Sequence, residues 1–276
     1  MISIVMAYFN RKPLLINTLR SLCNSKYDGD LEVIIVDDAS TNGESLEGLP
    51  SVFPRLNIKV YTVMREKKWW INPCIPFNIG FSLASGDKII IQNPECMHMG
   101  DILSEVSKQT VGEYKVFGAY SVGPVMTDSI NKLHSIADKD FVDMVHKIIR
   151  PTVDVRVELA RGYEKWYQHS VYNSGAINFC CSIMKSDLDA MGGFDERFAK
   201  GIAYDDREFI VRIRKMGLFV NQIDNPFVVH QCHGYTDYSN SVLVKRNEDL
   251  LREVTSSAEY KANNLLSDKL KYEVLI

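Results

Sequence analysis

The sequence predicts an α/β fold in which helices flank a central, mostly parallel sheet. Three observations support this prediction. Short β-branched segments alternate with helical patterns along the first half of the chain, polar residues follow three of these segments, and a length of 276 residues suits one large α/β domain or one domain with an appendage. A single helix between two strands implies a right-handed crossover, so the two strands run parallel.

The strands and helices of the first half follow from the hydrophobic pattern. A helix is predicted to begin near Pro13, where the missing N–H group of proline costs nothing, and its leucines recur at helical spacing. A second helix is predicted over residues 76–84, because Gly86 supplies the left-handed residue that often follows a helix. The predicted strands, all short runs rich in isoleucine and valine, are residues 2–6, 31–36, 58–63 and 88–91.

The second half of the chain is less regular. We expect a helix over residues 205–216, whose Phe209, Ile210 and Ile213 form one apolar stripe. No element is predicted within residues 123–170, a polar and aromatic stretch. The remaining predicted elements are strands at 114–122, 175–184, 218–223 and 227–229 and a turn at 192–195.

Composition excludes several classes of protein. The formal net charge is −3, the isoelectric point is near 6.1 and the sequence has no block of lysine and arginine, which argues against nucleic acid as the main partner. No apolar run approaches the roughly 18–20 residues of a transmembrane segment. The six cysteines form no Cys-x-x-Cys pair and the N-terminus lacks a cationic leader. We therefore expect free thiols and a cytoplasmic protein, or one peripheral at a membrane.

A dinucleotide-binding site of the Rossmann type is excluded by the first turn. Such a site needs a glycine-rich turn after the first strand, so that the pyrophosphate can reach the helix N-terminus. Residues 7–13 contain no glycine, and the sequence has no Walker pattern. A nucleotide bound by this fold must be held in another way.

Four stretches of the sequence are informative through their order and spacing. They are an opening strand with a Tyr-x-Asn turn at 2–10, an Asp-Asp strand end at 33–40, an Asn-x-Gly helix at 76–80, and an acidic segment after a Gly-Gly-Phe turn at 192–212. Together they resemble the family 2 glycosyltransferases, which have the nucleotide-diphospho-sugar transferase (GT-A) fold. The last stretch also resembles the C-terminal domain of the β-galactosyltransferases.

The resemblance implies a single catalytic domain over residues 1–240. Within it, residues 1–122 would bind the nucleotide-sugar, and residues 123–240 would bind the acceptor and a metal ion. Residues 241–276 are predicted to form a helical C-terminal extension, because they are charged and helix-prone with few cues to a core. An oligomer contact, a membrane-surface tail and a solvated cap are the roles open to this extension.

The nucleotide-binding residues implied by the resemblance lie where predicted strands end. A carboxylate there can accept the N3–H of a uracil ring, and the resemblance assigns this role to Asp38, while Asp37 supports the turn. An Asx turn without a ligand is the alternative. Three basic residues remain equal candidates for a contact with the diphosphate or the uracil, namely Arg65, Lys67 and Lys68. The other implied nucleotide-binding residues are Ala7, Tyr8, Asn10 and Asn93.

A divalent cation is implied by the positions of Glu95 and of two histidines. The Asp-x-Asp motif of the family is missing, and Asn93 and Glu95 occupy its first and last positions. A carboxylate oxygen suits Mn²⁺ or Mg²⁺, and the imidazoles of His230 and His233 favour Mn²⁺ over Mg²⁺. A plain β-turn around Glu95 and a hydrogen-bonded turn at the histidines are the alternatives.

Two adjacent acids at the start of a predicted helix are the catalytic candidates. Inverting transfer needs a carboxylate that takes the proton from the attacking hydroxyl group, and the resemblance assigns this role to Asp206. Asp205 would bind an acceptor hydroxyl group. The alternative is that both acids only interact favourably with the helix dipole. The acceptor-side residues are Gly193 and Trp166, and further aromatic faces on which a sugar ring could stack are Trp69, Trp70 and Tyr167.

The function implied is transfer of a hexosyl group from a nucleotide-diphosphate donor, with UDP expected, to a hydroxyl group on a saccharide or another acceptor. The transfer would be metal-assisted and would invert the anomeric configuration. Two alternatives stay open. The first is a nucleotidyltransferase, although such enzymes usually carry a glycine-rich basic loop that this sequence lacks. The second is an inactive carbohydrate-binding protein, which the missing Asp-x-Asp motif favours.

Overall fold

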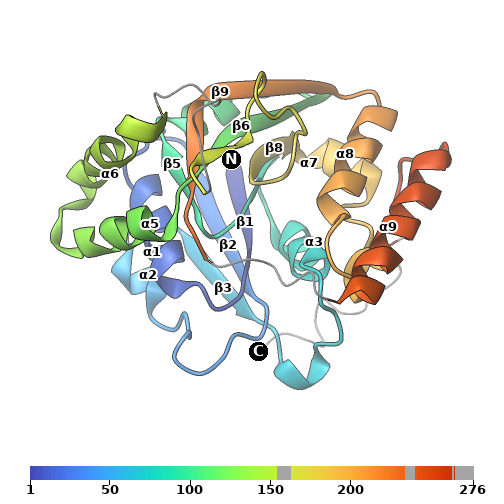
Figure 1. The fold of residues 1–276 in the computed structure, drawn as a ribbon, viewed down its shortest axis with the longest axis horizontal. Helices are drawn as coiled ribbons and strands as arrows, with labels where there is room; N and C mark the ends of the chain where they lie inside the picture. The colour runs from blue at the N-terminus through green and yellow to red at the C-terminus, as the bar shows by residue number, and fades with distance from the viewer. Residues whose placement is uncertain (154–162, 234–239, 263, 265–276) are drawn as a thin grey trace.

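One sheet runs through the centre of the molecule (Figure 1). The structure is a computed structural model, and it describes residues 1–153, 163–233, 240–262 and 264. The strands are β1 (Ile2–Tyr8), β2 (Leu31–Asp37), β3 (Ile58–Thr62), β4 (Lys88–Gln92), β5 (Cys96–Met99), β6 (Glu113–Ser121), β7 (Lys165–Gln168), β8 (Cys180–Met184) and β9 (Phe219–His230).

The sheet divides into a parallel part and a mixed part. Its strand order is β3–β2–β1–β4–β8–β6–β9–β5, and β7 pairs with β6. The strands from β3 to β4 are parallel, whereas β8 is antiparallel to both β4 and β6, and β5 is antiparallel to β9. The predicted α/β class is therefore confirmed. Parallel pairing holds in the N-terminal part and between β6 and β9.

Helices cover both faces of this sheet. They are α1 (Lys12–Leu22), α2 (Leu49–Val52), α3 (Cys74–Leu83), α4 (Ile102–Ser107), α5 (Pro124–Asn131), α6 (Asp138–Val153), α7 (Lys185–Met191), α8 (Asp205–Lys215) and α9 (Ser241–Ser256). Figure 1 shows α1, α2, α5 and α6 on one side of the sheet and α3, α7, α8 and α9 on the other.

Successive residues of the buried strands point to opposite faces. Val5 and Ile34 belong to the apolar cluster under α3 and α8, whereas Ile4 and Val33 belong to the cluster under α1. Because both faces are covered, these strands are continuous apolar runs rather than alternating ones. Gly80 of α3 lets that helix lie close to β1, since a Cβ at this position would come within 2.4 Å of a methyl group of Val5.

The stretch 123–170, in which the sequence pattern predicts no element, contains α5, α6 and β7. Phe141, Val145 and Ile149 recur every four residues and form the apolar stripe of α6. They belong to the same buried cluster as Tyr120 of β6. This stretch therefore forms a helical layer of its own on the sheet.

Strand β9 also differs from the expectation. The two short strands predicted at 218–223 and 227–229 belong to one strand, which pairs with β6 over residues 219–223 and 227–230. The register of this pairing shifts between Phe117 and Gly118, and the irregularity leaves both ends of β9 paired. As a result, His230 at the end of β9 lies opposite Cys96 of β5.

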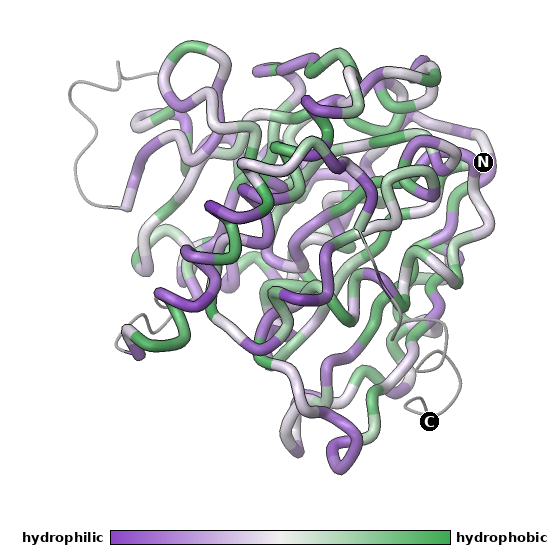
Figure 2. The backbone as a smooth tube through the Cα atoms, turned by 90° about the vertical axis from the view of Figure 1, so that its right-hand side faces the viewer, coloured by the Kyte–Doolittle hydropathy of each residue, from purple (hydrophilic) through white to green (hydrophobic). Residues whose placement is uncertain are grey.

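The C-terminal part packs against α8. Helix α9 lies beside α8 (Figure 1), and the backbone N–H of Ala262 donates to the carbonyl group of Met191 at 2.8 Å. Figure 2 views this side of the molecule and shows hydrophobic and hydrophilic residues mixed along its helices. Residues 265–276 of the predicted extension lie outside the described residues. Among the helices that the structure describes, none combines the length and hydrophobicity needed to cross a bilayer.

Candidate active site

The turns after β1 and β2 hold each other through side-chain hydrogen bonds. Asp37 Oδ1 accepts from the backbone N–H of Ser40 at 3.0 Å, so the predicted support of this turn by Asp37 is present. Asn10 Oδ1 accepts from the backbone N–H of Thr41 at 2.8 Å. Asn10, a predicted nucleotide-binding residue, thus links the two strand ends.

Asp38 lies buried between two donors. Its Oδ1 accepts from the indole Nε1 of Trp70 at 2.7 Å, and its Oδ2 accepts from Lys68 Nζ at 2.8 Å. Burial raises the pKa of the Asp38 carboxyl group, although both donors act in the opposite direction. Each carboxylate oxygen keeps a second lone pair that could accept from a uracil N3–H. Of the three basic candidates, the structure places Lys68 on this carboxylate.

The other predicted nucleotide-binding residues lie in positions less suited to contact with a nucleotide. The Tyr8 ring is fully buried, and its hydroxyl group donates to Glu44 at 2.7 Å, so this side chain belongs to the core rather than to a ligand surface. Ala7 is partly buried in β1. Arg65 donates to the carbonyl group of Ala39 at 3.3 Å, and Lys67 is exposed.

Glu95, His230 and His233 form one cluster, here called the acid–imidazole cluster. One ligand atom from each residue lies within 4.8 Å of the others, and Glu95 Oε1 is 3.4 Å from the Nε2 atom of both histidines. Glu95 lies between β4 and β5, His230 is the last residue of β9 and His233 follows it, and the pairing of β9 with β5 brings these positions together. The fold therefore gathers the three residues that the sequence assigns to a metal ion.

The electrostatics of the cluster suit a cation. Burial alone would raise the pKa of Glu95, but Arg11, His230 and His233 lower it further than burial raises it. Burial lowers the pKa of His233 to about 4, so its imidazole is neutral at pH 7. Arg11 Nη1 donates to Glu95 Oε2 at 2.9 Å. An ionised carboxylate and a neutral imidazole at this spacing are ligands that Mn²⁺ accepts.

The two candidate catalytic acids begin helix α8, which is anchored by a buried ion pair. Arg212 pairs with Glu208 on the same face of the helix, with Nη2 to Oε2 at 2.8 Å. The same guanidinium donates to the carbonyl groups of Met191 and Gly193 at 2.9 and 2.8 Å. These two hydrogen bonds join α8 to the turn at 191–193.

The turn at 191–196 is also joined to α3. Asn78 of α3 donates to the carbonyl group of Phe194 at 2.9 Å and accepts from its N–H at 2.8 Å. Gly193 has φ +70°, and a Cβ there would come within 2.5 Å of Asn78 Oδ1. Gly193 is buried, so its place in the structure is to let α3 meet the turn rather than to present a surface to an acceptor.

The chain enters α8 in a strained conformation. Ala203 and Tyr204 have φ angles of 60° and 69°, a region that residues with a side chain rarely adopt. Such strain persists only where surrounding contacts determine the backbone, and it is common at functional sites. Here it directs Asp205 and Asp206 into a cavity.

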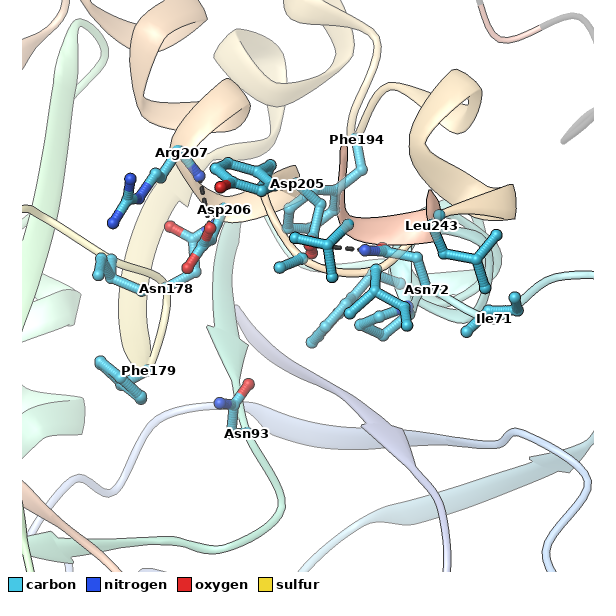
Figure 3. A pocket seen from close by; sticks show the side chains of 18 of the residues that line it. Ile71, Asn72, Asn93, Asn178, Phe179, Phe194, Asp205, Asp206, Arg207 and Leu243 are labelled. Atoms are coloured by element: carbon cyan, nitrogen blue, oxygen red, sulfur yellow. Dashed lines mark hydrogen bonds between the residues drawn. The ribbon is translucent and has the colours of Figure 1, made fainter. Parts of the chain in front are cut away.

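This cavity has a volume of about 950 Å³, and Asp205, Asp206 and Asn93 all line it (Figure 3). Asp205 Oδ1 accepts from Asn72 Nδ2 at 2.6 Å. Burial raises the pKa of both acids, and the charge of Asp206 raises that of Asp205 further. Figure 3 shows Asp206, Asn178 and Asn93 near the ring of Phe179 at one end, here called the polar end, and Ile71 and Leu243 beside Asn72 at the other, here called the aliphatic end.

The aromatic candidates separate into core and surface. Trp70 is buried against Asp38, whereas its neighbour Trp69 is 37% exposed. The Trp166 ring packs edge-on against Tyr120 and two further rings, with centroids 5.2 Å apart from Tyr120, and it is not part of the cavity wall. Tyr167 lies against His230, with ring centroids 5.2 Å apart.

Residues 3–164 match the family model described as Glycosyl transferase family 2, which is more than half of the chain. The chain belongs to glycosyl transferase family 2. It is thus a glycosyltransferase by family, and the match favours sugar transfer over nucleotidyl transfer. The predicted resemblance is confirmed.

Two relatives of this glycosyltransferase are chondroitin synthases. The Escherichia coli protein is 25% identical over 251 residues, which cover 83% of this chain and 34% of that protein. The Pasteurella multocida (strain Pm70) protein is 25% identical over 254 residues, which cover 83% of this chain and 24% of that protein. The chain therefore spans about a third and a quarter of the length of these relatives.

Solved structures with the same fold include TarS of S. aureus. Its 1–349 fragment in complex with UDP has a TM-score of 0.56 and 13% identity, covering 92% of this chain and 69% of that one. The complex with UDP-GlcNAc has a TM-score of 0.52 and 13% identity, covering 87% and 60%. The GT-A expectation for the fold is confirmed.

Three residues that the sequence does not single out lie at the site. Arg11 contacts Glu95, Asn72 contacts Asp205, and Asn178 lines the polar end of the cavity. A signal existed for Arg11 alone, because it follows β1 by three residues and the ends of parallel strands meet at one edge of the sheet. Asn72 and Asn178 lie in irregular segments without such a signal.

Proposed function

We propose that this glycosyltransferase moves a hexosyl group from a UDP-sugar to an acceptor hydroxyl group with inversion, and that Asp206 is the base. The observation that supports this most strongly is the shared cavity. Asp206 and Asn93 line it, and Asn93 lies two residues before Glu95 of the acid–imidazole cluster. A base and a diphosphate site must be adjacent for a one-step displacement at the anomeric carbon between them.

The nucleotide is assigned to the ends of β1 and β2. Asp38 retains acceptor capacity for uracil N3–H, and Lys68 beside it supplies a positive charge. The Phe9 ring is 44% exposed, with Lys68 Nζ 4.5 Å from its centroid, and it offers a flat face at the same edge. The TarS structures in complex with UDP and with UDP-GlcNAc have this fold, which supports UDP as the nucleotide.

Glu95, His230 and His233 would hold the divalent cation, with Mn²⁺ favoured and Mg²⁺ the alternative. The fit rests on the donor set and on its spacing within 4.8 Å. In addition, His230 Nδ1 is buried without a partner among the described residues, while Nε2 of the same ring lies 3.4 Å from Glu95 Oε1. Such an ion, when bound, neutralises charge on a departing diphosphate.

The remaining chemistry comes from side chains at the start of α8. Asp206 would take the proton of the attacking hydroxyl group, and the backbone N–H of Arg207 fixes its carboxylate at 2.7 Å. Asp205, held by Asn72, would bind the acceptor. The aliphatic end of the cavity is the side from which the acceptor would approach.

The test is a donor screen on the full chain. UDP-glucose, UDP-galactose, UDP-GlcNAc, UDP-glucuronic acid and, for comparison, GDP-mannose are incubated with the protein and Mn²⁺, and release of the nucleoside diphosphate is measured beside the melting temperature. We expect one donor to raise the melting temperature and to be hydrolysed slowly. Binding without hydrolysis or transfer would favour the carbohydrate-binding alternative, and preference for GDP-linked donors would refute the assignment of Asp38.

A further inference from the structure

Asn178 carries an amide group whose hydrogen bonds are incomplete. The residue is only 7% exposed and lies just before β8, in the wall of the cavity. Its Nδ2 atom is buried and has no hydrogen-bond partner among the described residues. A buried donor without a partner is costly, and it is rare in a folded protein unless a water or a ligand completes it.

Two groups lie at the oxygen of this amide. The hydroxyl group of Tyr114 donates to Asn178 Oδ1, and Cys181 Sγ lies 3.7 Å from the same oxygen. In this orientation the oxygen faces the protein, and Nδ2 is the atom left over. Tyr114 is itself fully buried in β6, which makes the arrangement rigid.

The position of Asn178 indicates which ligand it faces. Figure 3 shows the side chain beside Asp206, at the polar end of the cavity, above Phe179 and Asn93. The Phe179 ring is 5.4 Å from the ring of His230, and the backbone N–H of Asn93 donates to the carbonyl group of Phe179 at 3.1 Å. This end therefore adjoins the acid–imidazole cluster, while the aliphatic end lies further away.

We propose that Asn178 Nδ2 donates a hydrogen bond to an oxygen atom of the transferred sugar, and so contributes to the choice of donor. This inference rests on the proposed function. An N–H group requires an acceptor, which on a hexosyl group is a hydroxyl oxygen, a carboxylate oxygen or the carbonyl oxygen of an acetamido group. Asn178 does not reach the nucleotide in this scheme, because the nucleotide residues lie at the ends of β1 and β2.

The experiment compares the affinities of UDP and of a UDP-sugar for matched variants. The probes are UDP and the four UDP-sugars named above, and binding is measured by calorimetry with Mn²⁺. Asn178→Ala removes the donor. Ile177→Ala is the control, because Ile177 lines the same cavity from the neighbouring position and has no polar side-chain atom.

We expect Asn178→Ala to weaken the best UDP-sugar by roughly three- to tenfold, which is what losing one hydrogen bond costs. UDP should bind within about twofold of the unchanged protein, and Ile177→Ala should not discriminate between the two ligands. A structural role alone would lower the melting temperature and weaken UDP and UDP-sugar equally, and that result would overturn the proposal.

A second variant separates loss of sugar binding from loss of folding. Asn178→Ala removes the oxygen that accepts from the Tyr114 hydroxyl group, whereas Tyr114→Phe combined with Asn178→Leu removes both partners, a change that buried pairs often tolerate. The double variant should show the same sugar-specific loss. If the unchanged protein binds no UDP-sugar, the proposed function fails. If it binds one and both variants bind it equally well, only the role of Asn178 is refuted.

Discussion

Glu95 and the Asp205–Asp206 pair are carboxylates whose surroundings shift their pKa values in opposite directions. Glu95 is 1% exposed and is surrounded by Arg11 and two imidazoles, which lower its pKa. The aspartates line a cavity, burial raises the pKa of both, and the charge of Asp206 raises that of Asp205 further. Environment, rather than residue type, assigns different roles to acids within one site. The first arrangement suits binding of a cation, and the second suits exchange of a proton.

A substitution of Asp206 is the most direct test of the difference between these two groups of acids. Asp206→Asn keeps the size of the side chain and its acceptor for the Arg207 N–H, but it cannot take a proton. We expect turnover to fall by about 10²–10⁴-fold while UDP-sugar and Mn²⁺ still bind. The measurement is the rate of UDP release with saturating donor, beside calorimetric binding of the donor.

Asp205→Asn is the matched control for this change. It should reduce turnover less, because its carboxylate is assigned to acceptor binding and already accepts from Asn72. Near-normal turnover in Asp206→Asn together with loss in Asp205→Asn would show that the two roles are reversed. No effect of either change would refute the catalytic role of this helix.

A third acid on α8 is paired with an arginine, as Glu95 is, although burial raises its pKa as it does for the aspartates. Glu208 is fully buried and pairs with Arg212, which also holds the turn at 191–193. Arg212→Met leaves that carboxylate buried without its cation, and we expect the free energy of unfolding to fall by about 3–5 kcal/mol. Chemical denaturation measures this loss.

Arg214→Met on the same helix is the control, because Arg214 is exposed and should change stability by less than about 0.5 kcal/mol. Equal effects of the two substitutions would contradict the buried anchor.

The acid–imidazole cluster is tested by metal binding. Glu95→Gln and His233→Ala each remove one ligand atom, and we expect Mn²⁺ affinity to fall by at least about 10–100-fold, the usual cost of losing even an outer partner. Electron paramagnetic resonance of free Mn²⁺ measures the affinity. Asp205→Asn should leave it unchanged. Full sugar transfer in the presence of a strong chelator would contradict the cation assignment.

Asp38 provides a smaller test on the nucleotide side. Asp38→Asn replaces an acceptor by an amide whose NH₂ group opposes the uracil N3–H, and we expect UDP to bind about 1–3 kcal/mol more weakly. Calorimetry with UDP gives the value. Lys67→Met is the control, since Lys67 is exposed and makes no contact with Asp38 among the described residues. Unchanged UDP affinity in Asp38→Asn would remove the assignment.

The sequence predicts where the strands lie better than it predicts which side chains are buried and which face a ligand. Strands β1, β2 and β4 are recognisable because both faces are buried, which gives continuous apolar runs. Trp69 and Trp70 lie in an irregular segment with no period, so the pattern cannot tell which ring faces the core. Tyr8 shows a related limit, because a polar aromatic at a strand end suits a ligand surface as well as a buried hydroxyl group bonded to Glu44.

The sequence pattern cannot identify site residues whose role depends on a partner that is distant in the sequence. Glu95 and the two histidines come together only because β9 pairs with β5, and the sequence links them through the family resemblance alone. Asn178 is the extreme case. Its donor is left over only because Tyr114 and Cys181 occupy its oxygen, and neither residue is near the turn signals that mark a site.

The smallest expected effect is a shift in the pH profile. Burial raises the pKa of Asp206, and Arg207 lowers it, whereas burial and the charge of Asp206 raise the pKa of Asp205 to about 7. A base must be ionised, so turnover declines as the pH falls below the pKa of Asp206. The acid limb of the profile should therefore lie above the usual range of an aspartate.

Removing a neighbouring charge should move this limb in a direction fixed by its sign. Arg207→Met removes a positive charge and moves the limb to higher pH, by about one unit or less because the guanidinium group is exposed. Asp205→Asn should leave the limb in place, because the pKa of Asp205 is raised to about 7 and its carboxyl group is therefore protonated where Asp206 titrates. The measurement is kcat against pH at saturating donor and Mn²⁺. A shift in Asp205→Asn, or none in Arg207→Met, would mean that the limb reports a group other than Asp206.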